Sequence, residues 1–367
     1  MDDACHLGTD VGGTFTDLVF YTGSGEICCF KVPSTPSRPG ASILDGIDEI
    51  RETLGLDAAA WRRLCHTHSS TVATNALIER KGARIGMLVS AGFRDLFELQ
   101  RLAIPHPMRF DSRRPLPLVP RAMVREVRGR IGADGGEIEP LDAEGLLAAA
   151  RALVAAGVER AIVVFVHSYR NPAHERAAER LVAEHRIPLA LELSSAVWPQ
   201  AREYERAVLT AVNAGIRPIV EGYIERLEQG LAARAIPTPA RIARSNGGAE
   251  LAATMRQRPV VALLSGPAAG VAGAAAAAED AGWLTADLMT LDVGGTSADI
   301  GVIRGGRPVL SAEEHIADLP LLAITLASRG YTDAEIEAIM SGNWLRVLER
   351  ALPDQLVDAP EGTPAFH

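Results

Sequence analysis

The sequence predicts an α/β protein whose body contains two related halves, and three observations support this prediction. Residues 7–33 hold three short apolar runs separated by tight turns, which is the pattern of neighbouring strands. From residue 141 onward, apolar strands alternate with amphipathic helices, as in layered proteins with a mainly parallel core. The octapeptide DVGGTFTD at 10–17 returns as DVGGTSAD at 292–299, with six of eight positions identical.

The first part of the chain divides at Pro and Gly. The segment PSTPSRPG after the third strand predicts a loop. Residues 102–121 contain five prolines, so we expect irregular structure there. Between these segments we expect four regular elements: a helix over 41–54, a strand over 63–68, a helix over 71–81 and a short strand in ARIGMLVS.

The second part follows the alternating pattern. We expect helices in LDAEGLLAAARALVAAG and NPAHERAAERLVAEH, the second capped by Asn171 with Pro172 at its first position. AIVVFV and LALEL predict strands, and a long helical stretch covers 201–232 with a kink or break at Pro218. The uncharged stretch 259–278 is mostly Ala and Gly, too weakly apolar for a membrane span. We expect a buried strand, a turn and a tightly packed helix there.

Composition narrows the classes of function. The 367 residues suffice for two domains, and the net charge of -9 disfavours a nucleic-acid partner. The N-terminus MDDACHLGTD is acidic where a secretory signal would be basic. The four cysteines include one adjacent pair and no C-x-x-C, so neither a disulfide frame nor a thiolate zinc site is indicated. We therefore expect a cytoplasmic protein without a membrane partner.

The repeated octapeptide predicts a phosphate site. Glycine weakens a strand interior, but a turn without side chains lets backbone N–H groups approach a polyphosphate. An aspartate beside phosphate implies a divalent cation between them, and Mg²⁺ is typically held by one or two carboxylates plus phosphate oxygens. Two such hairpins would hold the β- and γ-phosphates of ATP. An ordinary Asp-Gly turn is the simpler explanation of one copy, but two copies with identical spacing disfavour it. The sequence has no P-loop and no G-x-S-x-G motif.

The two octapeptides resemble the phosphate-1 and phosphate-2 motifs of the actin, sugar-kinase and Hsp70 ATPase superfamily. Within that superfamily, residues 5–315 resemble the hydantoinase A/5-oxoprolinase family. The resemblance implies a ribonuclease-H-like, two-lobed (actin-like) ATPase fold. The family-like segments, in chain order, are KVPSTP, TVATNALIERKGAR, GFRDLFEL, SYRNPAHE, EYERAVLTAVNAGIRP, SNGG and LLSGPAAGV.

The resemblance also implies a function, namely ATP-dependent opening of a cyclic amide such as 5-oxoproline or a hydantoin. The family's A-type subunit usually works with a B-type subunit. Asp10 and Asp292 would be the catalytic and Mg²⁺-holding residues, with Asp17 and Asp299 as weaker candidates or turn caps. The phosphate-cradling residues would be Gly12, Gly13, Thr14, Gly294, Gly295 and Thr296.

Alternatives remain open at this point. Acetone carboxylase subunits resemble the same family. A catalytically silent nucleotide-binding or assembly protein and a small-molecule kinase are two further interpretations.

His66 and His68 form an H-x-H pair, which we interpret as structural or cleft histidines in preference to metal ligands. Ser69 stands where the family pattern has Gly, which leaves the local backbone open. The start of SGPAAGV could face an anion or could serve only close helix packing.

We expect the family resemblance to stop near residue 315. Family members continue there with a Gly-rich segment that, by analogy with the superfamily, helps to bind adenosine. Residues from about 320 to 355 resemble the C-terminal end of membrane-type zinc dipeptidases, without their metal-binding core. We therefore expect an N-terminal domain over 1–195, a truncated hydantoinase/oxoprolinase domain over 196–315 with an incomplete second lobe, and a short helical tail over 316–367.

Overall fold

The computed structural model describes residues 5–309, with internal gaps. The residues within this span that it does not describe are 24, 36–37, 39, 56–60, 63, 80, 103–115, 237–239, 284–286 and 294–297. At 78, 292, 293 and 298–300 only the backbone is described. The expected helical tail over 316–367 lies outside the described residues.

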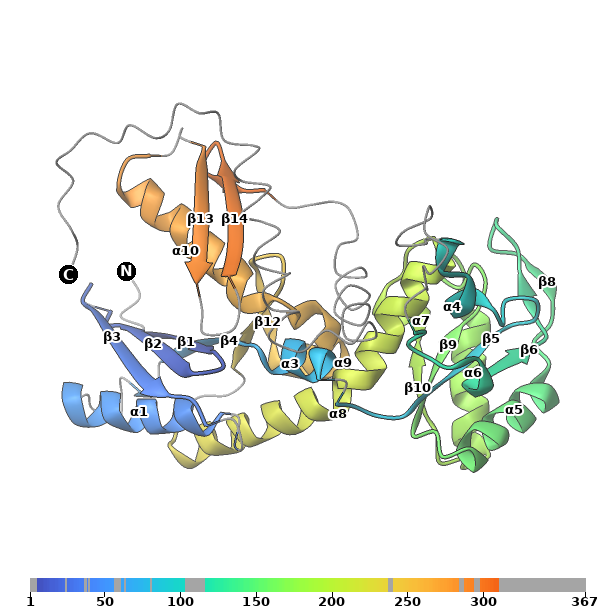
Figure 1. Ribbon diagram of the computed structural model, residues 1–367. Helices are drawn as coiled ribbons and strands as arrows, with labels where there is room; N and C mark the ends of the chain where they lie inside the picture. Colours follow the sequence, from blue (N-terminus) through green and yellow to red (C-terminus); the bar gives the residue numbers. More distant parts are fainter. Residues whose placement is uncertain are drawn as a thin grey trace.

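The first sheet has six strands in the order β12-β11-β4-β1-β2-β3 (Figure 1). The three strands expected over residues 7–33 are β1, β2 and β3, and they pair antiparallel. β4 pairs parallel with β1, β11 pairs parallel with β4, and β12 pairs antiparallel with β11. The strands are β1 (His6–Val11), β2 (Phe15–Tyr21), β3 (Ile27–Pro33), β4 (Cys65–Ser70), β11 (Arg241–Ala243) and β12 (Ala249–Leu251).

One face of this sheet is covered by α1 (Ala41–Leu54). Ile43, Ile47 and Ile50 lie on one side of that helix because they are three or four residues apart, and all three are fully buried. They pack against Leu18 and other inward side chains of the meander. The helix ends at Gly55, whose φ of 58° is left-handed, the usual conformation after a helix.

A second α/β unit is inserted between β4 and β11. Its four strands are all parallel in the order β10-β9-β5-β6, and the central strands are continuously apolar because they are buried on both faces. These strands are β5 (Ile85–Ser90), β6 (Val124–Val127), β9 (Arg160–Val164) and β10 (Ala190–Leu193). The unit's helices and the small β7–β8 hairpin are α4 (Leu96–Leu99), η1 (Gln100–Leu102), η2 (Arg121–Met123), α5 (Ala143–Ala155), α6 (Ala173–Glu184), α7 (Ser194–Val197), β7 (Arg130–Ile131) and β8 (Glu137–Glu139).

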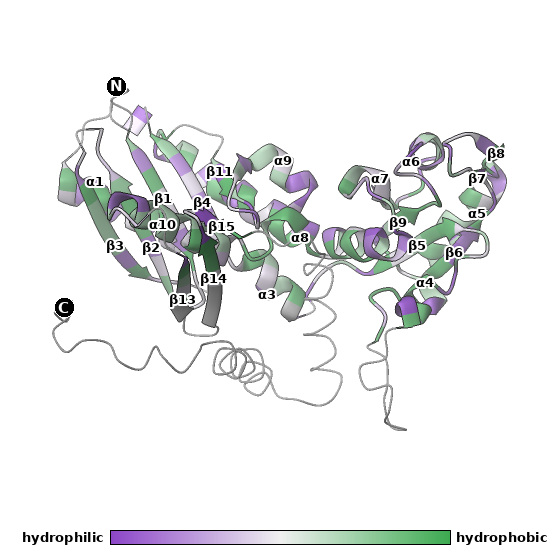
Figure 2. Cartoon of the chain, turned by 90° about the horizontal axis from the view of Figure 1, so that it is seen from above, coloured by the Kyte–Doolittle hydropathy of each residue, from purple (hydrophilic) through white to green (hydrophobic). Residues whose placement is uncertain are grey.

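The chain returns from this unit to the first sheet through α8 (Glu203–Ala233), which is one 31-residue helix. Pro218 lies inside it without ending it, so the expected break is not observed. Figure 2 shows two α/β bodies joined by this helix. The expected domain boundary at 195/196 lies between β10, the last strand of the inserted sheet, and β11, with which the chain returns to the first sheet.

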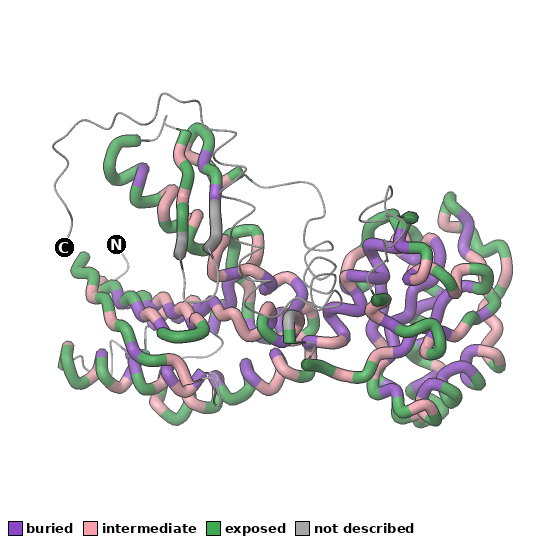
Figure 3. Tube along the Cα trace, viewed as in Figure 1, coloured by how far each residue is buried: buried purple, intermediate pink, exposed green. Residues whose placement is uncertain are grey.

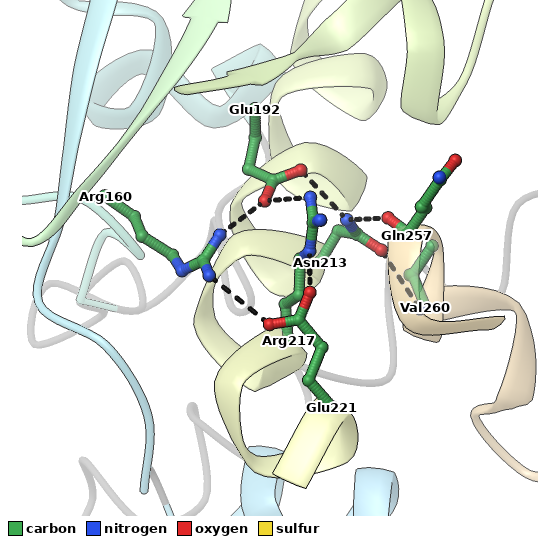
Figure 4. A network of polar contacts seen from close by, with 7 residues as sticks. All are labelled: Arg160, Glu192, Asn213, Arg217, Glu221, Gln257 and Val260. Carbon is green, nitrogen blue, oxygen red and sulfur yellow. Dashed lines mark hydrogen bonds and ion pairs between the residues drawn. The ribbon is translucent and has the colours of Figure 1, made fainter. Parts of the chain in front are cut away.

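A buried polar network connects the inserted unit to α8 and to the segment after α9 (Ala252–Gln257) (Figure 4). Glu192 of β10 accepts hydrogen bonds from Arg160 at 2.9 Å and Arg217 at 2.8 Å. Fully buried Asn213 of α8 donates to Gln257 O at 3.1 Å and accepts from Val260 N at 3.2 Å. Burial raises the pKa of Glu192, and the two arginines oppose that shift. The network therefore fixes the start of the 259–265 segment against α8.

Residues 259–280 differ from the expectation. Pro259–Ala262 form a 3₁₀ helix (η3) where a buried strand was expected, because Asn213 of α8 accepts the hydrogen bond of Val260 N and holds the segment as a turn. The helix α10 (Ser265–Asp280) forms as expected, but only Ser265 and Ala278 are buried in it (Figure 3). The expectation of a tightly packed helix is therefore wrong. Among the described helices, none combines the length and apolar content that a membrane span requires.

The last described elements form a small antiparallel sheet beside α10. Its strands are β13 (Leu288–Val293), β14 (Ala298–Arg304) and β15 (Arg307–Pro308). The remaining helix α3 (Val72–Ile78) follows β4 directly. The helix α10 contacts β4 and β11 of the first sheet as well as β13, β14 and β15, so it connects the two sheets that carry the repeated octapeptide.

Candidate functional site

Asp10 lies near the end of β1, on the sheet face opposite α1. Its neighbours Thr9 and Val11 point into the core and are buried, whereas Asp10 is half-buried. In the parallel pairing of β1 with β4, Asp10 is the partner of Ser69. The Ser69 hydroxyl donates a hydrogen bond of 2.5 Å to Asp10 Oδ1. The sheet therefore holds this carboxylate in a fixed orientation at a partly open edge.

The turn after Asp10 is closed by Gly12. Its N–H donates to Phe15 O at 3.0 Å, and a Cβ at this position would lie 3.1 Å from that oxygen. Glycine is thus needed for close approach within the turn, and this amide is already used there instead of facing a ligand. Gly13 and Thr14 are exposed at the tip of the turn. Of the three expected cradle residues in the first hairpin, Gly13 and Thr14 are therefore exposed and Gly12 is partly buried.

A set of hydroxyl groups fixes this turn to the rest of the sheet. Ser34 donates through Oγ to Gly12 O at 2.9 Å and through its N–H to Thr14 O at 2.9 Å. Thr16 Oγ1 lies 2.9 Å from Ser34 Oγ and 2.6 Å from Ser42 Oγ. On the other side, Thr71 donates to Val11 O. Side-chain hydroxyl groups therefore anchor the turn from both sides.

Asp17 has a different role from Asp10. It lies opposite Asp10 in the pairing of β1 with β2, and its carboxylate forms a 2.9 Å ion pair with Lys31 of β3. Both side chains are at least half exposed. Asp17 is therefore accounted for by a surface ion pair, a weak interaction in general.

The second octapeptide forms a hairpin with the same register as the first. Asp292 pairs with Asp299 across β13 and β14, as Asp10 pairs with Asp17 across β1 and β2. The side chains of Asp292 and Asp299 are outside the described part of the structure, as are Gly294, Gly295 and Thr296 altogether. The backbone thus repeats the hairpin, while the assignment of these residues to a phosphate site stays a prediction.

The first turn of α10 lies beside Asp10. A Cβ added to Gly266 would lie 3.4 Å from Asp10 Oδ1 and 3.7 Å from Oδ2. The residue before the helix, Leu264, has a left-handed φ of 59° and donates its N–H to Thr74 Oγ1 at 3.3 Å. Asp10 is therefore bordered by three elements, namely β4, the Gly12–Phe15 turn and α10.

The two histidines form a buried hydrogen-bonded chain behind Asp10. Thr9 Oγ1 lies 2.9 Å from both His66 Nε2 and His68 Nδ1, and the Tyr223 hydroxyl of α8 lies 2.6 Å from His68 Nε2. Within the described residues, no cluster of three or more His, Cys, Asp or Glu side chains is arranged to hold a metal ion. The H-x-H pair thus forms part of the hydrogen-bonded core between β1, β4 and α8.

Burial sets the charge of these groups. It lowers the pKa of His66 to about 4 and, together with the nearby His66, lowers the pKa of His68 to about 3. It raises the pKa of the Tyr223 hydroxyl well above its ordinary value. All three side chains are therefore neutral at pH 7. Because Thr9 precedes Asp10 and Ser69 follows His68, this neutral chain connects α8 to the two strands that carry the site.

The lowered histidine pKa values predict a pH-dependent stability. The unfolded chain binds protons near pH 6.5 and the folded chain only near pH 4 and 3, so stability is fully present above pH 6.5 and falls as the pH drops. We expect the free energy of unfolding to fall on the order of 3 kcal/mol between pH 7 and 5. Urea denaturation across this range measures it. The His66→Gln variant should lose about half of the slope, and an unchanged slope in that variant would contradict the assignment.

Several residues that contact Asp10 or its turn are not predicted by the sequence. Ser69 was marked only as a departure from a glycine pattern, yet it occupies a regular strand and binds Asp10 directly. Ser34, Thr71 and Gly266 carried no signal for Asp10, because each comes to the site through strand pairing or helix docking. The alternation of side chains along β4 could have indicated the position of Ser69, because it places Ser69 on the sheet face opposite His66 and His68.

The fold and the site together define a class: an α/β protein with mixed sheets that carries the same D-V-G-G-T hairpin twice. Two family models match the chain, the hydantoinase/oxoprolinase N-terminal region at residues 6–186 and hydantoinase/oxoprolinase at 206–331. The chain therefore belongs to the hydantoinase/oxoprolinase family. The second match extends to residue 331, so the expectation that the resemblance ends near 315 is wrong.

The curated relatives of the chain include a caprolactamase subunit and a 5-oxoprolinase. Caprolactamase subunit alpha of Pseudomonas jessenii is 34% identical over 340 residues, which cover 90% of this chain and 49% of that subunit. 5-Oxoprolinase 1 of Arabidopsis thaliana is 30% identical over 332 residues, covering 81% of this chain and 25% of the relative. The chain thus spans about half, or less, of the length of these relatives.

Two solved structures, a caprolactamase and an acetone carboxylase, are similar to the chain. The crystal structure of the ATP-dependent caprolactamase from Pseudomonas jessenii matches with a TM-score of 0.72 and 36% identity, over 81% of this chain and 43% of that one. The nucleotide-free structure of acetone carboxylase, described as ATP-dependent, matches with a TM-score of 0.74 and 26% identity, over 83% and 45%. Both neighbours are thus described as ATP-dependent.

Proposed function

We propose that this chain supplies a nucleotide-binding site to an enzyme that opens a cyclic amide at the expense of ATP, in the role of an A-type subunit. The observation that carries the proposal is the Asp10 carboxylate, oriented by Ser69 beside the exposed Gly13–Thr14 tip of a glycine turn. The lactam-opening relatives supply the reaction class. The cyclic amide, a small molecule such as a lactam, 5-oxoproline or a hydantoin, is the substrate of this proposal.

The residues present fit a magnesium–nucleotide complex. Mg²⁺ keeps several waters and takes one or two carboxylates plus phosphate oxygens, so it needs no cage of protein ligands. The Asp10 side chain is partly exposed, and its Oδ2 lies beside Gly266. When bound, the cation neutralises charge on the β- and γ-phosphates. Asp10 and Asp292 are the proposed ligands, through water.

The chain's own residues would bind and orient the phosphates. In this proposal the backbone N–H groups of Gly13 and Thr14 face phosphate oxygens, and Gly294, Gly295 and Thr296 do so from the second hairpin. Gly12 closes the turn through its N–H, and Ser34 stabilises the turn by a hydrogen bond to Gly12 O. The γ-phosphoryl group passes to the amide oxygen and ADP leaves. Water then adds to the amide carbon, and the ring C–N bond breaks as the nitrogen takes up a proton, which leaves an acyl phosphate. A second water hydrolyses this acyl phosphate to the carboxylate and free phosphate.

We extend the proposal to a two-lobed, actin-like arrangement. The first sheet supports it, since an antiparallel meander followed by two parallel strands in the order β11-β4-β1-β2-β3 is the ribonuclease-H-like pattern. The hairpin β13–β14, with its repeated register, would open the second lobe. A B-type partner subunit is part of the proposal, and the relative named as subunit alpha supports it.

A second candidate is a subunit of an ATP-dependent ketone carboxylase, which the match to the acetone carboxylase structure favours. The 367-residue chain, with a B-type partner, should be assayed for ATP hydrolysis with lactams and hydantoins, and separately with acetone plus bicarbonate. Amide-stimulated ADP release with a ring-opened product supports the first proposal. Ketone- and bicarbonate-dependent ADP release supports the second. Nucleotide binding without turnover under either condition would indicate a silent binding or assembly protein.

A further inference from the structure

The second hairpin, β13–β14, has one apolar face that is exposed. Met289 and Leu291 of β13 and Val302 of β14 lie on this face, because Met289 pairs with Val302 and side chains two residues apart point the same way. Their exposed fractions are 48%, 64% and 44%. The opposite face packs on α10, where Gly301 lies against Val271. The hairpin therefore leaves a patch of three large apolar side chains uncovered in the described part of the chain.

The first hairpin shows what covers the same face in the other copy of the repeat. In the register that the two octapeptides set, the equivalent residues are buried, namely Leu7 at 1%, Thr9 at 5% and Phe20 at 1% exposure. The helix α1 covers them with three isoleucines at positions i, i+4 and i+7 of its apolar side. The same hairpin face is thus buried under an amphipathic helix in one copy and exposed in the other.

The chain beyond the second hairpin contains a segment that matches this need. The described chain ends at Val309, whose N–H donates to Val302 O at 2.8 Å, so the following residues start beside the patch. Residues 332–352 lie beyond both family models and open with the capping box T-D-A-E. Residues 310–331 are long enough, at about 3.3 Å each, to bring this segment to any part of the small sheet. Its apolar side chains recur three or four positions apart, at Ile336, Met340, Trp344, Val347 and Ala351.

We propose that residues 332–352 form a helix that docks on Met289, Leu291 and Val302 and covers the second hairpin as α1 covers the first. The docking removes apolar surface of both partners from water, and Glu349 on the opposite side of the helix stays in solvent. A tethered segment has a higher effective concentration at the patch than a separate molecule has. The chain's own segment is therefore favoured over a second copy of the chain. This inference does not depend on the proposed nucleotide site.

The test is hydroxyl-radical footprinting of the 367-residue chain, which measures how fast the Met289 side chain is oxidised. In the wild type, Met289 should be oxidised at least about fivefold more slowly than in the urea-unfolded chain, and dilution should not change this protection. Met340→Asp places a charge on the apolar side of the segment, so Met289 should approach its unfolded rate. Ala338→Asp, on the opposite side of the same helix, is the control and should keep the wild-type protection. Met255, which is fully buried, should stay slow throughout and so reports that the fold is kept.

Three outcomes would overturn the inference. Oxidation of wild-type Met289 within about twofold of the unfolded rate would show that the face is open. Protection that weakens on dilution would assign the face to a second copy of the chain. Protection that survives Met340→Asp would assign it to another part of the chain. Each of these results would leave the proposed nucleotide site untouched, because that site is tested by nucleotide binding.

Discussion

Replacing Asp10 with asparagine is expected to weaken Mg²⁺-dependent nucleotide binding at least about 100-fold, a large effect because the charge that attracts the cation is lost. Asparagine has nearly the same shape and can still accept the hydrogen bond from Ser69, so the fold should be kept. Calorimetric titration with Mg·ATP measures the affinity, and the Tm checks the fold. Amide-stimulated ATP hydrolysis should fall with it.

The matched control for this prediction is Asp17→Asn. Asp17 lies opposite Asp10 in the same hairpin, but its carboxylate pairs with Lys31 near the surface. Removing its charge should change nucleotide affinity by less than about twofold, since exposed ion pairs contribute little. Equal losses in both variants would mean that the hairpin shape was disturbed. No loss in Asp10→Asn would place the cation elsewhere.

Replacing Arg206 with alanine is expected to lower the free energy of unfolding by about 3–5 kcal/mol, which is a large share of a domain's stability. Arg206 is fully buried in α8 and donates to Ser194 Oγ at 3.0 Å, Gln200 O at 2.9 Å and Phe165 O at 2.9 Å. Burial lowers its pKa, and the charge of nearby Glu175 opposes that shift. The alanine variant would leave these acceptors without a donor.

The cost is large because Glu175 remains. Its carboxylate is fully buried and accepts from Ser194 Oγ at 2.6 Å, Phe165 N at 3.1 Å and Ser195 N at 2.9 Å. Without Arg206 it becomes a buried charge without a compensating cation. The double variant Arg206→Met, Glu175→Gln should therefore lose less stability than Arg206→Ala.

Urea denaturation, with refolding as a check of reversibility, measures this difference. Arg128→Ala is the control, because Arg128 pairs with Glu139 while 75% exposed, and it should cost less than about 1 kcal/mol. If Arg206→Ala costs no more than this control, the buried network is not a main support of the inserted unit. If the double variant costs more than the single one, the uncompensated charge is not the cause.

Local sequence patterns predicted most of the regular elements. The helix expected over 41–54 is α1, and the alternation from residue 141 gives α5, β9, α6 and β10 in the expected order. The helix expected after Asn171 begins at Ala173 with Pro172 as its N-cap residue, one position later than expected, and Asn171 Oδ1 accepts from Ala173 N at 3.0 Å. Each of these depends on residues within a few positions of one another, so spacing and capping chemistry determine them.

Elements that depend on distant partners were harder to predict. The run after Pro259 looks like a buried strand by composition, but Asn213 of α8 holds it as a 3₁₀ turn. The first sheet includes β11 and β12 because the parallel unit is inserted between β4 and β11, and the sequence pattern did not indicate this pairing. The composition of a segment shows how apolar it is. Whether the segment pairs as a strand depends on which elements lie next to it in the folded protein.

By itself, the sequence determined the repeated hairpin. The two D-V-G-G-T octapeptides form strands with the same register, because glycines and short polar residues at fixed spacing favour one turn between two alternating strands. Only the tertiary structure decided what surrounds Asp10. Ser69 reaches it through the pairing of β1 with β4, and Gly266 through the docking of α10 on β4. These contacts join residues far apart in the chain, so they form only when the packed core brings the elements together.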